Sequence, residues 1–216
     1  MARTPAPGTR ERILTTASRL FYEHGVRAVG MNQIITEAGT GKNLLYSHFP
    51  TKSDLVAAYL RRAQEFRVAG ARRARESADG DARSQLIATV AEVATLVQHP
   101  RFRGCAFRNY LAEFPNETGT AETGTAETGT TDTGDDAPPT PAAVARDFLA
   151  ATREDLAAQV AALDVADPER LTEELWLIVD GLFLQAAYRR RLDGRVGADA
   201  AVDLAGRLVD AAIGDR

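Results

Sequence analysis

The sequence has few of the residues that cross-link a chain or hold a metal ion. It contains a single cysteine, Cys105, and three histidines, His24, His48 and His99. One cysteine excludes an internal disulfide, and such a chain suits a reducing compartment. The histidines lie far apart and lack metal-ligand spacing. The sequence therefore predicts no metal site and no cofactor.

Long apolar runs are also missing. The most apolar stretch, residues 175–187, is too short to cross a bilayer, and Asp180 and Gln185 interrupt it. The N-terminal residues lack the long apolar core of a signal peptide. A hydrophobic content of 44% is ordinary for a globular protein. We therefore expect a cytoplasmic protein with no membrane partner.

Lysine is nearly absent, and the charge is unevenly distributed. The whole chain carries a formal net charge of −4. Residues 1–52 hold seven Lys or Arg against three Glu, which gives +4, so the remainder carries −8. A basic segment attached to an acidic remainder is typical of local phosphate binding. The only two lysines are Lys42 and Lys52, and both lie in or beside the clearest motif of the chain.

That motif occupies residues 31–49, MNQIITEAGTGKNLLYSHF. Apolar residues recur at helical spacing over its first part, and Gly39 then ends the helix. A second short helix follows over 42–48, with Leu45 and Phe49 one turn apart and polar residues on the other faces. Two short helices joined by a glycine turn predict a helix-turn-helix, which indicates a DNA-binding protein.

The rest of the chain also follows helical periodicity, with no candidate strand. Thr51 and Asp54 have the spacing of a capping box that opens a long fourth helix. A sixth helix is predicted over 103–114, and Pro168 suits the start of an eighth. The prediction is an all-α protein of about nine helices. It comprises a three-helix DNA-binding domain over 1–51 and a larger helical regulatory and dimerisation domain over 52–216.

A repeat interrupts this pattern at about 116–140. ETGTA recurs at Glu117 and Glu122 and then degrades to ETGTT and DTGDD. The repeat offers no apolar face to bury, and no Lys or Arg neutralises its acids. We predict a disordered acidic loop, with a short β-repeat as the alternative.

Dispersed anchor residues precede position 60: TRERIL at 9–14, Leu20-Phe21, His24-Gly25, Ile34, Glu37-Ala-Gly39, Lys42, Leu45-Tyr46, His48-Phe49 and Lys52. Through these anchors, roughly residues 9–60 resemble the N-terminal domain of the tetracycline-repressor (TetR) family. Two positions depart from the family pattern. Gly30 stands where a small polar cap is usual, and Gly41 stands where serine is frequent.

The resemblance implies which residues face DNA. Those of the turn and second helix would be Thr40, Lys42, Asn43, Leu44, Tyr46, Ser47 and His48. We expect mainly phosphate contacts from Lys42, Tyr46, His48 and Lys52. Base reading is expected from Asn43, Leu44 and Ser47, together with Asn32 and Gln33. The alternative is an ordinary solvated helix face.

The resemblance also implies a ligand pocket in the larger domain. The candidate lining residues are Phe66, Phe102, Cys105, Phe107, Tyr110, Trp176, Asp180 and Phe183, and ordinary core packing is the alternative for each aromatic. A carboxylate such as Asp180 in an apolar helix costs several kcal/mol unless it is partnered or hydrated. A structural partner, a ligand contact and a subunit seam all remain open for it. The segment 103–114 further resembles a Gly-Cys-hydrophobic-Asn-Glu segment of one branch of the family.

The function implied is that of a homodimeric regulator, usually a repressor, released from a palindromic DNA operator by a small-molecule effector. The last two helices would form the dimer interface. One alternative is a regulator gated by a protein or by oxidation of Cys105. The other is an all-α enzyme or carrier. No Ser/His/Asp or Cys/His grouping can be assembled from the sequence, so we expect no enzyme.

Overall fold

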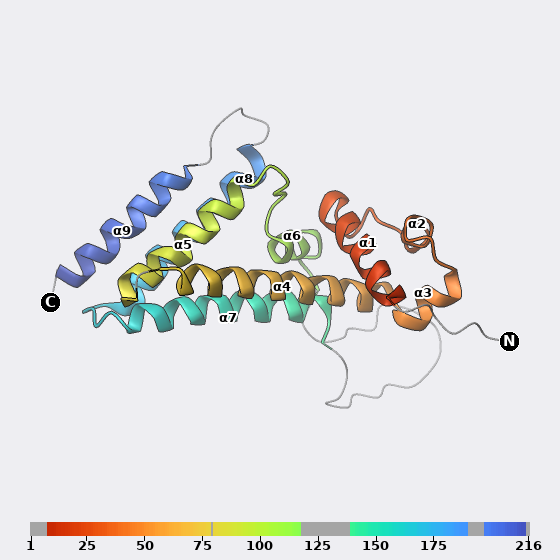
Figure 1. Cartoon of the computed structure of the whole chain (residues 1–216), viewed down its shortest axis with the longest axis horizontal. Helices are drawn as coiled ribbons and strands as arrows, with labels where there is room; N and C mark the ends of the chain where they lie inside the picture. The colour runs from red at the N-terminus through yellow and green to blue at the C-terminus, as the bar shows by residue number, and fades with distance from the viewer. Residues whose placement is uncertain (1–7, 79, 118–138, 190–196, 215–216) are drawn as a thin grey trace. The chain divides into compact units, whose positions relative to one another are not determined.

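The computed structural model describes residues 8–78, 80–117, 139–189 and 197–214 (Figure 1). Within these ranges the chain forms nine α-helices and no strand. The helices are α1 Thr9–His24, α2 Met31–Glu37, α3 Lys42–His48, α4 Lys52–Glu76, α5 Ala82–Gln98, α6 Ala106–Glu113, α7 Pro141–Ala161, α8 Pro168–Arg189 and α9 Ala198–Gly214. The all-α prediction and the number of helices are confirmed. Residues 118–138, which hold most of the predicted acidic loop, lie outside the described ranges.

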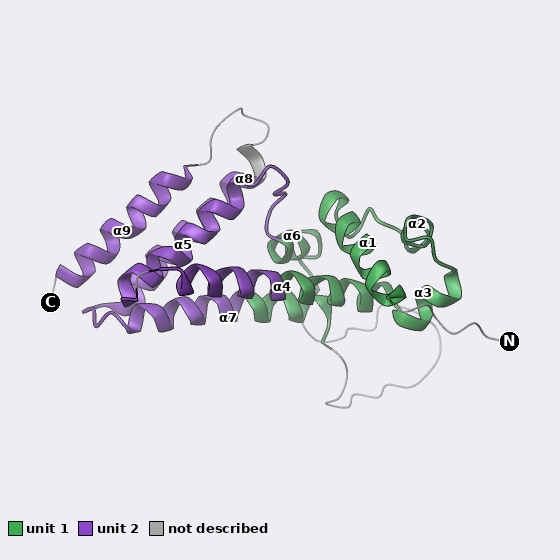
Figure 2. Ribbon diagram, in the orientation of Figure 1, with its two compact units in different colours: residues 1–63, 106–148 green, residues 64–105, 149–216 purple. Residues whose placement is uncertain are grey.

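The chain divides into two compact units (Figure 2). Unit 1 holds Met1–Ala63 and Ala106–Phe148, and unit 2 holds Gln64–Cys105 and Leu149–Arg216. Helices α4 and α7 contribute residues to both units. The functional division at residues 51 and 52 stays a prediction. No described helix is long and apolar enough to span a bilayer.

The first three helices of unit 1 pack around one apolar core. Helix α1 buries Ile13 and Leu20, α2 buries Ile34, and α3 buries Leu45, each 0 or 1% exposed. This burial follows the helical spacing of the apolar residues. Gly39 has a φ of 58°, a left-handed conformation that glycine adopts without steric penalty. The chain can therefore turn sharply between α2 and α3, as the sequence predicted.

The predicted capping box at the start of α4 is confirmed. The Asp54 carboxylate accepts hydrogen bonds from the Thr51 backbone N–H at 2.9 Å and from its hydroxyl at 2.7 Å. In return, the Asp54 N–H donates to the Thr51 hydroxyl at 3.1 Å. These bonds satisfy N–H groups that a helix start leaves unpaired.

The predicted start of the sixth helix is wrong by a few residues. The sequence pattern placed it at Arg103, whereas α6 begins at Ala106. Gly104 has a φ of 107°, which a right-handed helix cannot contain. The residues before Ala106 therefore form a turn, and the helix starts only after it.

In unit 2, helices α5, α8 and α9 pack against one another. Their contact faces bury Leu86, Leu175 and Val209, each fully inaccessible to solvent. Arg83 of α5 and Asp210 of α9 add a paired contact, with Nε to Oδ1 at 2.5 Å and Nη2 to Oδ2 at 2.8 Å. Such a two-bond geometry fixes the register of the two helices.

Candidate nucleic-acid interface

Helices α2 and α3 are held in place by contacts from α1. The Arg12 Nε donates to the Ala38 carbonyl at 3.0 Å, which satisfies an acceptor at the end of α2. The Arg10 guanidinium lies 4.9 Å from the centre of the Phe49 ring, directly after α3. These contacts fix both ends of the helix-turn-helix against its supporting helix.

Helix α3 has one buried side and one polar exposed side. Leu45 is fully buried and Phe49 is 2% exposed, so both residues point into the core. The predicted DNA-facing residues Lys42, Asn43, Tyr46 and Ser47 are exposed, and Leu44 is half-buried. A short helix that presents this set from a fixed position has the geometry of a recognition helix for the major groove.

Both predicted base-reading residues of α2, Asn32 and Gln33, are exposed. The Gln33 amide donates to Glu37 at 3.0 Å, and Arg19 of α1 donates to the same carboxylate at 2.5 Å. The two hydrogen bonds hold the pKa of Glu37 below its ordinary value, and the bond from Gln33 has the larger effect. Gln33 is thus already engaged in the absence of DNA.

Thr40, His48 and Lys52 point their polar atoms toward the protein. The Thr40 hydroxyl oxygen and His48 Nε2 are buried without a hydrogen-bond partner in the described part of the chain. The Lys52 ammonium donates to the Val26 carbonyl at 2.6 Å, and burial lowers its pKa. The DNA contacts predicted for these three residues stay predictions.

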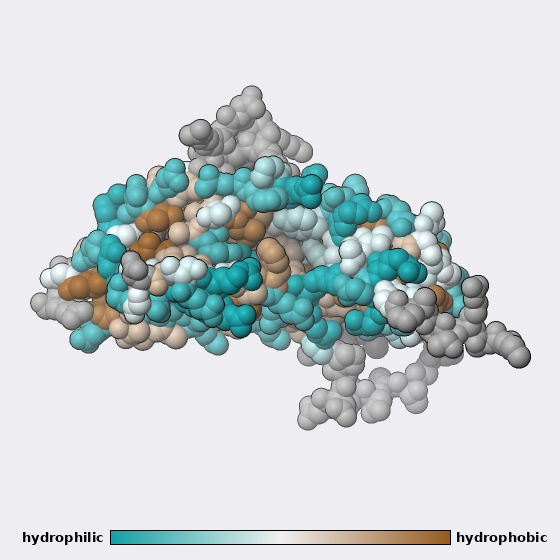
Figure 3. Space-filling view, in the orientation of Figure 1, coloured by the Kyte–Doolittle hydropathy of each residue, from teal (hydrophilic) through white to brown (hydrophobic). Residues whose placement is uncertain are grey.

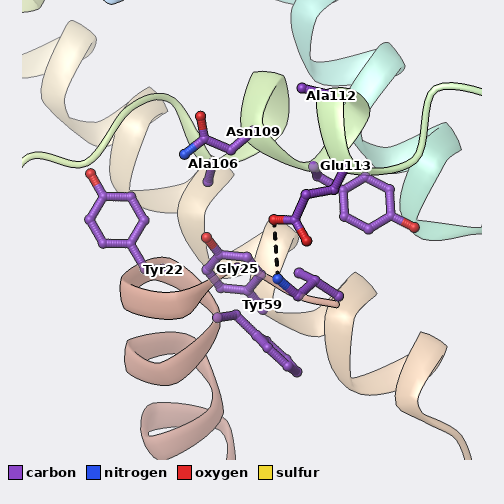
Figure 4. Close-up of a pocket in the computed structure, with 10 residues that line it drawn as sticks. Tyr22, Gly25, Tyr59, Ala106, Asn109, Ala112 and Glu113 are labelled. Carbon is purple, nitrogen blue, oxygen red and sulfur yellow. Dashed lines mark hydrogen bonds between the residues drawn. The ribbon is translucent and has the colours of Figure 1, made fainter. Parts of the chain in front are cut away.

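The loop between α1 and α2 is held by a residue that the sequence analysis did not select. The Glu113 carboxylate of α6 accepts from the Val26 N–H at 3.2 Å and from the Arg27 N–H at 2.8 Å. A cavity of about 270 Å³ lies beside this contact, lined by residues of α1, α4 and α6 and of the loop after α1 (Figure 4). The available signal was the Asn109 to Glu113 spacing inside the segment 103–114, which puts both side chains on one face of α6.

The predicted ligand-pocket residues fall into both compact units. Phe107 and Tyr110 belong to unit 1, and the others belong to unit 2. In unit 2 the rings of Phe102 and Phe183 lie 6.0 Å apart. Five of the candidates are buried, namely Phe102, Cys105, Phe107, Tyr110 and Phe183, whereas Trp176 and Asp180 are half-buried. Phe66 lies at the surface, 61% exposed.

An ion pair between Arg67 and Glu92 lies next to these unit 2 aromatics. Nη1 and Oε1 are 2.8 Å apart, and the two side chains are only 17% and 16% exposed. The Arg67 guanidinium lies 5.9 Å from the centre of the Phe183 ring. Glu92 Oε2 is buried and has no hydrogen-bond partner among the described residues. The sequence signal was a lone carboxylate in the apolar helix at 86–97, the same signal that selected Asp180.

The arrangement of α1, α2 and α3 defines the class of the protein as a helix-turn-helix DNA-binding protein. The family profile described as bacterial regulatory proteins, tetR family, matches residues 13–59. The matched segment, which contains α2 and α3, is therefore similar to the DNA-binding part of this family of transcriptional regulators.

Among curated relatives, the transcriptional activator FasR of Mycolicibacterium smegmatis is 35% identical over 97 residues, 45% of this chain and 44% of that protein. The transcriptional regulator LmrA of Bacillus subtilis is 47% identical over 49 residues, which cover 23% of this chain and 26% of LmrA. The matches thus span less than half the length of these relatives.

Solved structures extend the likeness over the whole fold. SCO4454, a TetR-family transcriptional regulator from Streptomyces coelicolor, superposes with a TM-score of 0.75 at 25% identity, covering 98% of this chain and 91% of that one. A TetR transcription regulator from Haloarcula marismortui gives a TM-score of 0.67 at 20% identity, covering 94% and 97%. The second likeness supports the fold alone.

Proposed function

We propose that the protein is a homodimeric, cytoplasmic transcriptional repressor that binds a palindromic operator and is released by a small-molecule effector. The observation that carries the proposal is α3, whose exposed side presents Lys42, Asn43, Tyr46 and Ser47 from a helix anchored through Leu45. Lys42 and Tyr46 serve as phosphate contacts. Asn43, Leu44 and Ser47, with Asn32 and Gln33, read base edges.

The dimer interface is proposed on α8 and α9. Leu177 and Leu184 of α8 are 67% and 65% exposed, and Leu204 of α9 is 40% exposed. Leu177, Gly181 and Leu184 recur at the spacing of one helix face, with a glycine where a partner helix can approach closely. Figure 3 includes hydrophobic side chains at the visible surface of unit 2. A two-fold symmetric contact, in which the same face of a second copy packs against this one, would bury these exposed leucines.

The effector site is proposed in unit 2, where Phe102 and Phe183 adjoin the Arg67–Glu92 pair. Helix α4 supplies Arg67 and also belongs to unit 1. An effector that favours one position of α4 would change the distance between the helix-turn-helix elements of the two protomers in a dimer. The result is a population shift away from the operator-binding state.

A mobility-shift titration with DNA from upstream of the protein's own gene, repeated over a range of salt concentrations, tests the DNA-binding part. We expect a specific complex whose affinity falls steeply with salt. The enzyme or carrier alternative predicts no such complex. Transcription from that DNA in a purified system then tests the sign of regulation. FasR, named an activator, makes activation the second candidate.

A further inference from the structure

We propose that the cavity lined by α1, α4 and α6 binds a small organic cation through Glu113 and its aromatic walls. Binding draws the Glu113 carboxylate away from the Val26 and Arg27 amides. The cavity part of the proposal is independent of DNA, whereas its consequence for the operator rests on the proposed function.

The walls of the cavity favour a cation. Four of its ten lining residues are aromatic, namely Phe21, Tyr22, Tyr59 and Tyr110. Aromatic faces carry negative potential and attract alkylammonium groups. A volume of about 270 Å³ suits a ligand of a few heavy atoms, slightly below the usual range for drug-sized molecules.

Glu113 is the one charged residue among those that line the cavity. In Figure 4 its carboxylate, hydrogen-bonded to the Val26 N–H, lies on the same side of α6 as the Asn109 side chain. An anionic ligand would be repelled by this carboxylate. The charge and the aromatic walls therefore select the same chemical class.

Two basic side chains, Lys52 and Arg27, lie near Glu113, but their charged groups contact other atoms. The Lys52 ammonium donates to the Val26 carbonyl, and the Arg27 guanidinium lies 4.7 Å from the centre of the Phe114 ring. Neither residue lines the cavity. Tyr110 donates to Glu117 at 2.5 Å, and burial raises its pKa, so its ring presents a neutral face. The residues that line the cavity therefore include no basic side chain that could neutralise the Glu113 carboxylate.

The position of the carboxylate depends on a glycine. A Cβ at Gly25 would lie 2.8 Å from Glu113 Oε1, closer than real Cβ contacts allow. Gly25 also has a φ of 84°, which favours glycine. The carboxylate can approach the loop amides only because no side chain stands at this position.

The two hydrogen bonds of Glu113 connect the cavity to the reading element. They hold Val26 and Arg27, in the loop that leads from α1 into α2. A cation that turns the carboxylate toward the aromatic walls leaves both amides without this acceptor. The loop then holds α2 less firmly, and the affinity for the operator falls.

The binding test uses the full chain labelled with 15N and followed by backbone amide spectra, without DNA. Tetramethylammonium chloride is titrated against tert-butanol, a neutral molecule of similar shape, and against sodium chloride at equal ionic strength. We expect saturable shifts of the Val26 and Arg27 amides with tetramethylammonium only. Equal shifts with tert-butanol, or no saturable shift with tetramethylammonium, would overturn the proposal.

Two variants keep the test interpretable. Glu113→Gln preserves the size of the side chain, and Tyr22→Leu removes an aromatic wall without touching the loop contact. Each is expected to raise the Kd for tetramethylammonium about tenfold, with an unchanged spectrum for α5 and α9 as the folding control. An unchanged Kd in both variants would show that the cation binds elsewhere.

The consequence for DNA is measured separately. Saturating tetramethylammonium should weaken operator binding by the wild-type chain and leave Glu113→Gln unaffected at equal ionic strength. Cation binding without this difference would contradict the coupling. Absence of any operator complex, with cation binding intact, would contradict the proposed function and leave the cavity assignment standing.

Discussion

Arg67 and Glu92 form a largely buried ion pair between α4 and α5, with 2.8 Å between Nη1 and Oε1. Gly70 makes room for it, since a Cβ there would lie 2.8 Å from Glu92 Oε1. Removing one partner of such a pair leaves a charge in an environment that solvates it poorly. The pair therefore constrains substitution in unit 2 more than any exposed pair does.

Glu92→Ala is expected to lower the free energy of unfolding by about 3 kcal/mol, because it leaves the Arg67 charge unpaired. The double variant Arg67→Met with Glu92→Leu should recover most of that loss. Urea unfolding measures both. The exposed pair of Arg72 and Glu76, 67% and 65% accessible, gives the control, and Arg72→Ala should change stability by less than about 0.5 kcal/mol. A double variant no more stable than Glu92→Ala would contradict the coupling.

Gly30→Ser and Gly41→Ser are each expected to stabilise the chain by about 0.5 kcal/mol. Both glycines precede a helix with extended backbone angles and no side-chain cap, and a Cβ at either position would meet no atom of the described residues within 4 Å. Gly39→Ser is the matched control, and it should destabilise by about 1 kcal/mol because its φ of 58° is left-handed. Denaturant midpoints of the three variants separate the two effects. Equal effects at all three positions would refute this account.

The Arg83–Asp210 pair should stabilise unit 2 only at a pH above the range where aspartate protonates. Hydrogen bonds from Arg83 lower the pKa of Asp210 in the folded chain relative to the ordinary 3.8. Its contribution is therefore present above pH 3.8 and is lost as the pH falls through the lower folded-state pKa. The melting temperature of Asp210→Asn should lie below that of the wild type near neutral pH and approach it in acid. Asp203→Asn, at an exposed position of α9, is the control and should show no such convergence.

Leu177→Glu combined with Leu184→Glu is expected to convert a dimer to monomers, since both side chains lie on the exposed apolar face of α8. Sedimentation velocity measures the change. Val68→Glu in α4 is a matched control, because Val68 is 55% exposed and apolar but lies outside the proposed interface. A dimer that survives the double substitution would place the subunit contact elsewhere.

What the sequence predicted well was local. The capping box of Thr51 and Asp54 joins residues three apart, and the break at Gly39 depends on one backbone conformation. Glu113 differs, because its partner Val26 is 87 residues away in the chain. No periodicity or composition encodes that distance. Arg67 and Glu92 are similar, since each looks like an ordinary helix residue until two helices are packed together.

The difference between local and long-range contacts also explains why the DNA-facing residues were predicted only in part. Helical spacing distinguishes Leu45 from the exposed Lys42 and Asn43, because burial follows the helix period. It does not predict that Lys52 donates its hydrogen bond to Val26, since that contact depends on how α4 packs beside the loop. The sequence therefore predicts which residues lie on the exposed face of α3. It does not predict the hydrogen-bond partners of side chains that point toward the protein.

The central claim is that the exposed side of α3 binds DNA, and the salt dependence of operator affinity for Lys42→Ala tests it most directly. Arg72→Ala, which removes the same charge from an exposed site in unit 2, is the control. The account predicts that Lys42→Ala weakens binding to all sequences and reduces the slope of log affinity against log salt by about 1, whereas Arg72→Ala leaves the slope unchanged. Equal slopes for the wild type and both variants would contradict it.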